Sequence, residues 1–281
     1  MVRIISDSST LYSEAQAKEK GFDIVPLCVT IGGETYRENE DITTREFIKL
    51  IKEGHIPTSS QPAIGQVVDM FERYKNDEII NISMADGLSG TYNSACCAKD
   101  IAENSENITV VNSMTLCGPQ RYIVENAVEL AKIGKSKDEI LNSIDKMIKS
   151  SRSFLIPKDF DYLVRGGRLS PLVGKIGSAI KLVPVLTLSE DSTRLTKFTT
   201  KRTFQKAVDK ICDSLIESGV DSNYKVYITH ACTEELEALA RKIITERIPN
   251  IDVESYILGP VFTTQGGPDC VAIQTIKKMV Y

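Results

Sequence analysis

EIINISMADGLSGTYNSACCAKD, residues 78–100, joins a strand-like apolar run to a helix-like run through a group of small polar residues. The run over 78–84 is rich in isoleucine, which favours a buried strand. Ser89, Gly90 and Thr91 then stand where a helix is expected to begin, because hydroxyl side chains cap the free N–H groups of a first turn. A strand that leads directly into a helix is the repeating unit of α/β proteins. This stretch therefore predicts an α/β fold.

The same alternation extends over the rest of the chain. In the first half we expect strands over 2–6, 78–84 and 108–113, a strand and hairpin over 24–38, and helices over 43–54, 63–76, 116–133 and 136–150. In the second half we expect strands over 181–189, 194–199, 225–231 and 252–259, and helices over 201–219, 233–246 and 268–279. The stretch 156–180 breaks this rhythm with two prolines and a Gly-Gly pair. We therefore predict two α/β domains with mainly parallel sheets, over residues 1–155 and 156–281.

The composition excludes several functional classes. A net charge of -4 and a pI of about 5.5 give no general basic surface for nucleic acid. No apolar run approaches the roughly 20 residues that span a bilayer, and the N-terminus turns polar too early for a secretory signal. The 7 cysteines lack metal-site spacing and fit reduced thiols, and 2 histidines make a His-based metal site improbable. We expect a cytoplasmic protein without a metal.

Polar stretches follow the expected strands at 6–10, 58–62, 86–94 and 261–269. Ligands of parallel sheets bind beyond the carboxyl ends of the strands, where these stretches lie. They are rich in hydroxyl, amide and glycine residues and poor in charge, which suits holding an oxyanion more than breaking a bond. Within them we expect Ser8, Ser60 and Gly266 as secondary ligand contacts.

Two of the local patterns have competing interpretations. A helix start beside Gly90 is a ready anion site, yet Ser89 and Thr91 are equally explained as a redundant N-cap. Arg165 and Arg168 in the RGGR stretch fit a phosphate or partner contact, since guanidinium groups match oxyanions. They also fit a turn with two solvated arginines.

Several stretches, in this order, resemble the DegV family, the fatty-acid-binding proteins that serve bacterial fatty-acid kinase. They are SDSS (6–9), TSSQPA (58–63), GLSGTYNSA (87–95), DYLVRGGRLS (161–170), KLVPVLTL (181–188) and GPVFTTQGGP (259–268). The resemblance spans nearly the whole chain. It implies two α/β domains that enclose one fatty acid, with the carboxylate near the domain junction and the acyl tail in an apolar tunnel.

The resemblance also implies the residues around the carboxylate. The serine of the family's S-G-T motif falls on Ser89, beside Gly90 and Thr91. Ser59 takes the place of the usual threonine in the family's T-S-Q-P motif. Gln265 takes the place of a histidine in the closing motif. Glutamine donates a hydrogen bond but cannot become cationic, so this chain would hold a carboxylate with neutral donors and a helix terminus.

The function implied by the resemblance is that of a carrier, not an enzyme. The chain would bind a long-chain fatty acid such as palmitate, without a cofactor, and present its carboxylate to a kinase subunit for acyl-phosphate formation. From their charge alone, Arg165 and Arg168 are expected to contact that partner or, transiently, a membrane surface, and no nucleic acid is expected. Two alternatives remain open: a binding protein for a different anionic amphiphile, suggested by Gln265, and an acyl hydrolase with Ser89 as nucleophile.

Overall fold

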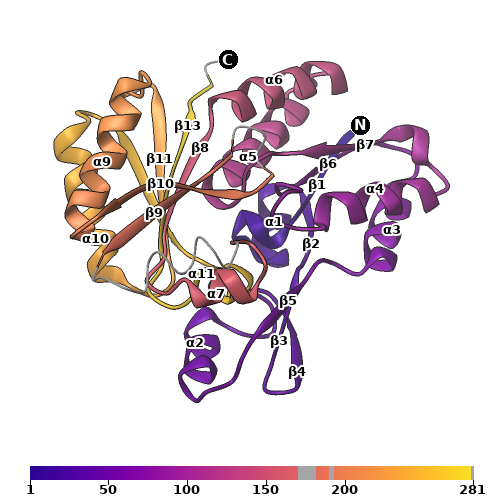
Figure 1. Ribbon diagram of the computed structural model, residues 1–281. Helices are drawn as coiled ribbons and strands as arrows, with labels where there is room; N and C mark the ends of the chain where they lie inside the picture. The colour runs from indigo at the N-terminus through magenta and orange to yellow at the C-terminus, as the bar shows by residue number, and fades with distance from the viewer. Residues whose placement is uncertain (170–181, 190–192, 280–281) are drawn as a thin grey trace.

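The computed structural model describes residues 1–169, 182–189 and 193–279, and confirms the α/β class. Two sheets stand on either side of helices α5 and α6, with α3 and α4 outside the first sheet and α9 and α10 outside the second (Figure 1). A small third sheet lies at one end of the molecule with α2 (Figure 1). Part of the stretch 156–180, from residue 170 onward, lies outside the described residues.

The first sheet is four-stranded and parallel throughout, as the sequence predicted. Its order is β2 (Asp23–Val25), β1 (Val2–Asp7), β6 (Glu78–Ser83), β7 (Ile108–Asn112). Alternate side chains face opposite layers: Ile80 packs towards α5 and α6, whereas Ile79 packs towards α3 and α4. Both faces are therefore buried, which explains the continuous apolar run of β6.

The helices around this sheet begin close to the predicted positions, except α1, which was not predicted. They are α1 (Glu14–Lys20), α3 (Ile64–Arg73), α4 (Thr91–Ile101), α5 (Cys117–Lys132) and α6 (Lys137–Ser150), with short 3-10 turns at Ser8–Thr10 and Ser105–Asn107. Ser136 caps α6, because its side chain accepts from the backbone N–H of Glu139 and the Glu139 side chain accepts from Ser136 N.

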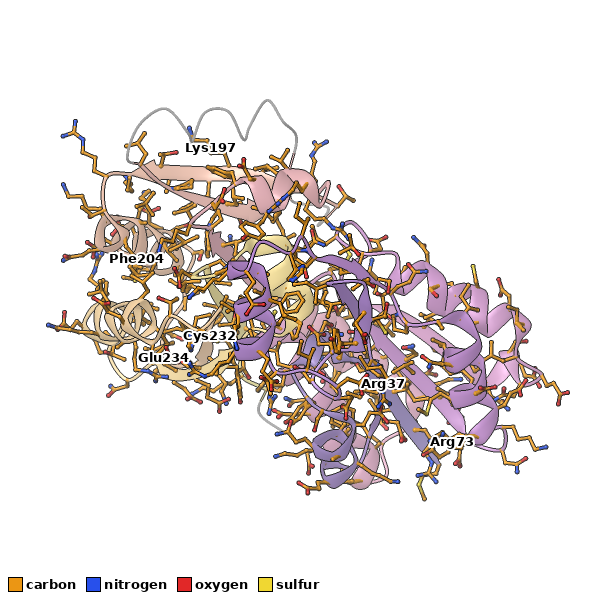
Figure 2. All side chains as sticks on the ribbon, turned by 90° about the horizontal axis from the view of Figure 1, so that it is seen from below. Arg37, Arg73, Lys197, Phe204, Cys232 and Glu234 are labelled. Atoms are coloured by element: carbon orange, nitrogen blue, oxygen red, sulfur yellow. The ribbon has the colours of Figure 1, made fainter. Side chains whose placement is uncertain are left out.

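The second sheet is six-stranded and mostly antiparallel, which differs from the expected parallel order. Its order is β10 (Leu195–Lys201), β9 (Val183–Leu188), β8 (Arg152–Ile156), β13 (Val271–Lys277), β11 (Tyr224–His230), β12 (Asp252–Ile257). Only β11 and β12 pair in parallel among these described strands, and α10 (Glu234–Arg247) connects them. Helix α9 (Phe204–Glu217) packs beside α10; Figure 2 shows Phe204 and Glu234 at their starts, far from Arg73 of α3.

The helix predicted over 268–279 is wrong, because this segment forms β13 in the centre of the second sheet. Both neighbours, β8 and β11, pair with it, and its side chains are buried on both faces. A strand buried on both faces shows no alternation of apolar and polar residues, so periodicity alone cannot tell it from a buried helix. The β-branched residues of VAIQTIK were the available signal.

The third sheet is three-stranded and antiparallel, in the order β4 (Glu34–Arg37), β3 (Cys28–Ile31), β5 (Thr58–Ser60). The hairpin expected over 24–38 is confirmed between β3 and β4, and its turn residues Gly32 and Gly33 both have positive φ. The loop expected over 58–62 instead contributes β5, and the loop expected over 261–269 begins with helix α11 (Pro260–Gly266). Helix α2 (Thr44–Lys52) has its N-cap at Thr43, and α7 (Asp161–Arg165) is a further short helix.

One core cluster spans both large sheets. Ile123 and Ile144 from α5 and α6 pack with Ile80 of the first sheet and with Tyr227 and Ile276 of the second. The change from the first sheet to the second comes before β8, which pairs with β13 from Arg152 onward. No helix in the described ranges is long and apolar enough to cross a membrane.

Candidate functional site

A cavity of about 320 Å³ lies where the three sheets meet. Its rim is formed by β5, by the loop before α4, by the segment after α7 and by the end of α11. These elements bring together three of the four polar stretches expected to hold a ligand, namely 58–62, 86–94 and 261–269. The cavity therefore joins residues from both halves of the chain.

Ser59 and Gln265 face each other across this rim. Gln265 Nε2 donates to Ser59 Oγ at 2.9 Å, although the two residues are 206 positions apart in the chain. The side chain of Gln265 packs against Gly166, where an added Cβ would come within 1.8 Å of Gln265 Oε1. Because Ser59 Oγ accepts this hydrogen bond, its own proton is available to a ligand. Ser59 and Gln265, which the resemblance places at one site, thus lie in direct contact.

Ser89 and Gly90 line the cavity at the start of α4, whereas Thr91 does not. Ser89 Oγ lies 2.8 Å from Thr91 Oγ1 and accepts from Thr91 N at 3.3 Å, so Ser89, one position before the N-cap Gly90, pairs one N–H of the first turn. Gly90 is packed by Gln61, whose Oε1 would lie 2.1 Å from a Cβ at this position. Ser89 therefore both contacts the first turn of α4 and faces the cavity.

Arg168 lies in the wall of the same cavity, while Arg165 at the end of α7 stacks its guanidinium 4.6 Å from the Tyr162 ring. Arg168 Nε donates to the main-chain oxygen of Leu88 at 3.0 Å, and Nη1 donates to that of Gly166. Half-burial lowers the pKa of Arg168 below its usual value. Within the described lining Arg168 is the one charged side chain. From the sequence, Arg168 fitted a phosphate or partner contact or a solvated turn, and its position in the cavity wall was not predicted.

Of the three residues expected as secondary ligand contacts, two line the cavity and one is buried outside it. Ser60 and Gly266 line the cavity. Ser8 is fully buried outside it: Ser8 Oγ donates to Glu38 Oε2 at 2.7 Å and accepts from Leu27 N at 3.0 Å. The Ser8 hydroxyl therefore makes hydrogen bonds within the protein and does not face the cavity.

Glu38 forms hydrogen bonds with the buried Ser8 and with helix α11. Its Oε1 accepts from Val261 N at 2.8 Å, in the first turn of the helix that ends at Gln265 and Gly266. Burial raises the pKa of the Glu38 carboxyl to about 7. Asp7 is buried too, and burial raises its pKa as well.

The interior of the cavity is mainly apolar. It is lined by leucines of several elements and by Met84, Val261 and Phe262, with a polar group of Ser153, Thr187 and Gln274. No aspartate, glutamate, lysine or histidine belongs to the described lining, so this part of the chain offers Ser89 no general base. The described residues also contain no cluster of histidine, cysteine and acidic side chains that could hold a metal ion. An apolar interior with hydroxyl, amide and guanidinium groups suits a ligand that is apolar over most of its surface and polar or anionic at one end.

Comparison with known protein families gives one match over residues 1–278, to the model described as "Uncharacterised protein, DegV family". A DegV domain-containing protein from Listeria innocua is 30% identical over 277 residues, which are 97% of each chain. A second, from Staphylococcus aureus, is 30% identical over 278 residues, 98% of each chain.

Solved structures show the same architecture. The crystal structure of DegV from Bacillus subtilis, described as a fatty acid binding protein, has a TM-score of 0.85 at 29% identity and covers 99% of both chains. A DegV family protein from Thermus thermophilus, described by its fatty acid binding, has a TM-score of 0.89 at 24% identity over 99% of both chains. A third, from Eubacterium eligens, is loaded with heptadecanoic acid and has a TM-score of 0.85 at 22% identity over 99% of this chain and 100% of that one.

Proposed function

The chain belongs to the DegV family, and from this premise we propose that its cavity binds one long-chain fatty acid. The observation that carries the proposal is the cavity itself, an apolar interior with hydroxyl, amide and guanidinium groups gathered at the rim. Relatives of the same fold are described as fatty acid binding proteins, which supports the same ligand class here.

The carboxylate is proposed to lie at the rim, between Ser59, Ser89 and Arg168. The Ser59 oxygen accepts from Gln265, so the Ser59 proton is free to be donated to the carboxylate. Arg168 lies in the wall and is the one charged group of the described lining, so it supplies the attraction for an anion that a neutral glutamine lacks. Gly90 has no side chain, so the carboxylate can come close to the main chain at the N-terminus of α4.

The acyl tail is proposed to supply most of the affinity. Burial of about fifteen methylene groups at roughly 0.8 kcal/mol each contributes on the order of 12 kcal/mol before the entropy of ordering the ligand is subtracted. The rim groups then determine orientation, with the head outward and the tail inward. This orientation leaves the carboxylate accessible to another protein.

We further propose that a kinase subunit phosphorylates the carboxylate while the tail stays bound. The chain then presents a substrate and performs no chemistry of its own. This role agrees with a described lining that contains no acidic, lysine or histidine side chain. The same observation disfavours the Ser89 hydrolase. A different anionic amphiphile is the remaining alternative, and it is distinguished by what the protein carries when purified.

The test is mass spectrometry of organic extracts from the purified wild-type protein, Ser89→Ala and Ser136→Ala. Ser136→Ala is the matched control, because it removes the cap of α6 at a distance from the cavity. We expect about one fatty acid per chain in the wild type and in the control, and much less in Ser89→Ala. An empty wild-type protein that also takes up no added fatty acid contradicts the proposal.

A further inference from the structure

Three polar side chains lie together inside the otherwise apolar cavity, at Ser153 on β8, Thr187 on β9 and Gln274 on β13. We call this group the polar floor. Gln274 is opposite Ser153 in the strand register, and Thr187 Oγ1 donates to Ser153 O at 2.9 Å. Ser153 and Thr187 are half-buried and also line a second cavity, so the buried Gln274 is the member of this group for which a tail of methylene groups supplies no partner.

The Gln274 side chain has a buried acceptor without a donor. Its Nε2 donates to Leu116 O and to Ser153 Oγ, both at 3.0 Å, which uses both of its protons. Because Leu116 O only accepts, the amide orientation is fixed with the nitrogen on that side. Gln274 is 2% exposed, and none of the described residues donates to its Oε1. A buried acceptor left unpaired is unfavourable, so a donor brought by a ligand stabilises it.

The same condition recurs at the rim. Three side-chain amide oxygens among the described residues are buried without a donor, those of Asn104, Gln265 and Gln274. Two of the three belong to cavity residues. The unpaired amide oxygens are therefore concentrated where a ligand is expected.

The register of β13 sets the distance between the rim and the polar floor. Cys270 Sγ lies against Gly266 at the rim, where an added Cβ would come within 2.7 Å of it. Gln274 follows four positions later, which corresponds to about 13 Å along a strand. An extended acyl chain advances by roughly 1.25 Å per bond, from bond lengths near 1.5 Å at tetrahedral angles, so this distance spans about ten bonds.

We propose that the cavity is selective for a fatty acid that carries a hydroxyl group near the middle of its chain. This inference rests on the proposed function and names the ligand class within it. The hydroxyl donates to Gln274 Oε1, and its oxygen accepts from the Ser153 hydroxyl. Both polar groups are then paired inside an apolar wall, and a plain saturated tail leaves Gln274 Oε1 unpaired.

The test uses delipidated protein and displacement of a fluorescent fatty acid by stearic acid and by monohydroxystearic acids with the hydroxyl at successive positions. We expect a mid-chain isomer to bind roughly ten-fold more tightly than stearic acid, a change that equals about 1.4 kcal/mol. Isomers with the hydroxyl near the methyl end should bind more weakly than stearic acid, because their hydroxyl is buried against apolar side chains of the cavity.

The variant Gln274→Met keeps the side-chain length and removes the polar group, so it should reverse the preference in favour of stearic acid. The matched control is Leu155→Met, which alters the cavity wall on the neighbouring strand without changing its polarity. Stearic acid binding at least as tightly as every isomer overturns this inference and leaves the proposed function standing. Failure of stearic acid and all isomers to bind overturns the proposed function instead. The isomer series in the wild-type protein decides between these outcomes even if Gln274→Met does not fold.

Discussion

At the scale of single residues, the site depends on which groups are charged. Gln265 donates to Ser59, and both are neutral, so the described lining draws its positive charge from Arg168 alone. An arginine stays protonated throughout the physiological range even after half-burial has lowered its pKa. The attraction of the rim for a carboxylate is therefore expected to lack the pH dependence that a histidine at position 265 would introduce.

The substitution Gln265→His tests whether residue 265 determines the pH dependence of carboxylate binding. An imidazole gains charge as the pH falls through about 6.5, whereas a carboxylic acid stays mostly ionised down to about pH 5. The ratio of wild-type to variant dissociation constants for palmitate should therefore rise between about pH 8 and pH 5.5, by up to roughly ten-fold. Displacement titrations at four pH values measure it. A ratio that stays constant over this range shows that the imidazole does not act on the carboxylate.

At the scale of elements, helix α11 is positioned from its N-terminus by a buried carboxylate. Glu38 follows strand β4, accepts from Val261 N and is held by Ser8, so it connects the third sheet, the first sheet and α11. Gly259 has no room for a side chain, because an added Cβ would lie 2.2 Å from Glu38 Oε1. The hydrogen bond from Val261 N to Glu38 therefore helps to fix the position of the rim residues at the end of α11.

The stability of the protein should respond to the ionisation of Glu38. Burial raises the Glu38 pKa from 4.5 to about 7, so the stabilising protonated form is fully present below about pH 4.5 and is lost as the pH rises through 7. Relative to wild type, Glu38→Gln should gain about 3 kcal/mol in the free energy of unfolding between these limits, on top of a constant cost for the altered contact to Ser8. Urea unfolding at several pH values measures this difference.

Glu46→Gln is the matched control, with the opposite sign. Hydrogen bonds from Thr43 lower the pKa of this exposed carboxyl, so its contribution is present at neutral pH and is lost as the pH falls. Glu46→Gln should therefore lose stability relative to wild type as the pH rises from 4. A parallel response of the two variants contradicts the assignment of Glu38.

The elements show what the sequence can and cannot predict. The capped amphipathic helices and the β3–β4 hairpin follow from local chemistry, as Thr43, Ser136 and Gly32 illustrate. The nature of β13 and β5 depends on partners far along the chain: β13 is paired on both sides, and β5 pairs with β3. The position of Arg168 and the presence of the polar floor are likewise set by tertiary packing. Family motifs predicted the rim residues, whereas Gln274 belongs to no motif and was missed.

At the scale of the whole molecule, the two large sheets share one core. Helix α5 packs between them, and Gly118 in its first turn lies against the ring of Tyr227 on β11. The sheets are therefore expected to unfold in a single transition, because neither buries its inner face without α5 and α6.

Gly118→Ala probes this contact between the sheets. The added Cβ would come within 2.1 Å of Tyr227 Cγ and 2.3 Å of Tyr227 Cβ, so α5 has to move away from β11. Overpacking of this kind should lower the free energy of unfolding by about 1–3 kcal/mol or more. Thermal unfolding by circular dichroism measures it.

Gly65→Ala is the control for glycine replacement in a helix. Gly65 lies in α3 with nothing within 4 Å of an added Cβ, so the substitution should stabilise the protein by about 0.5 kcal/mol. Equal effects of the two substitutions would mean that helix propensity, and not the contact between sheets, determines the result.

The central place of β13 has a consequence for synthesis on the ribosome. The strands β8, β9, β10, β11 and β12 all emerge before β13, yet β8 and β11 both require it as their neighbour. Until residues 271–277 leave the exit tunnel, the nascent second sheet has two open backbone edges at its centre. The first sheet has by then been complete for more than half of the translation time, since its last strand ends at Asn112. The late strand therefore exposes the nascent chain to pairing with other chains, and slowed translation before β13 is expected to increase aggregation.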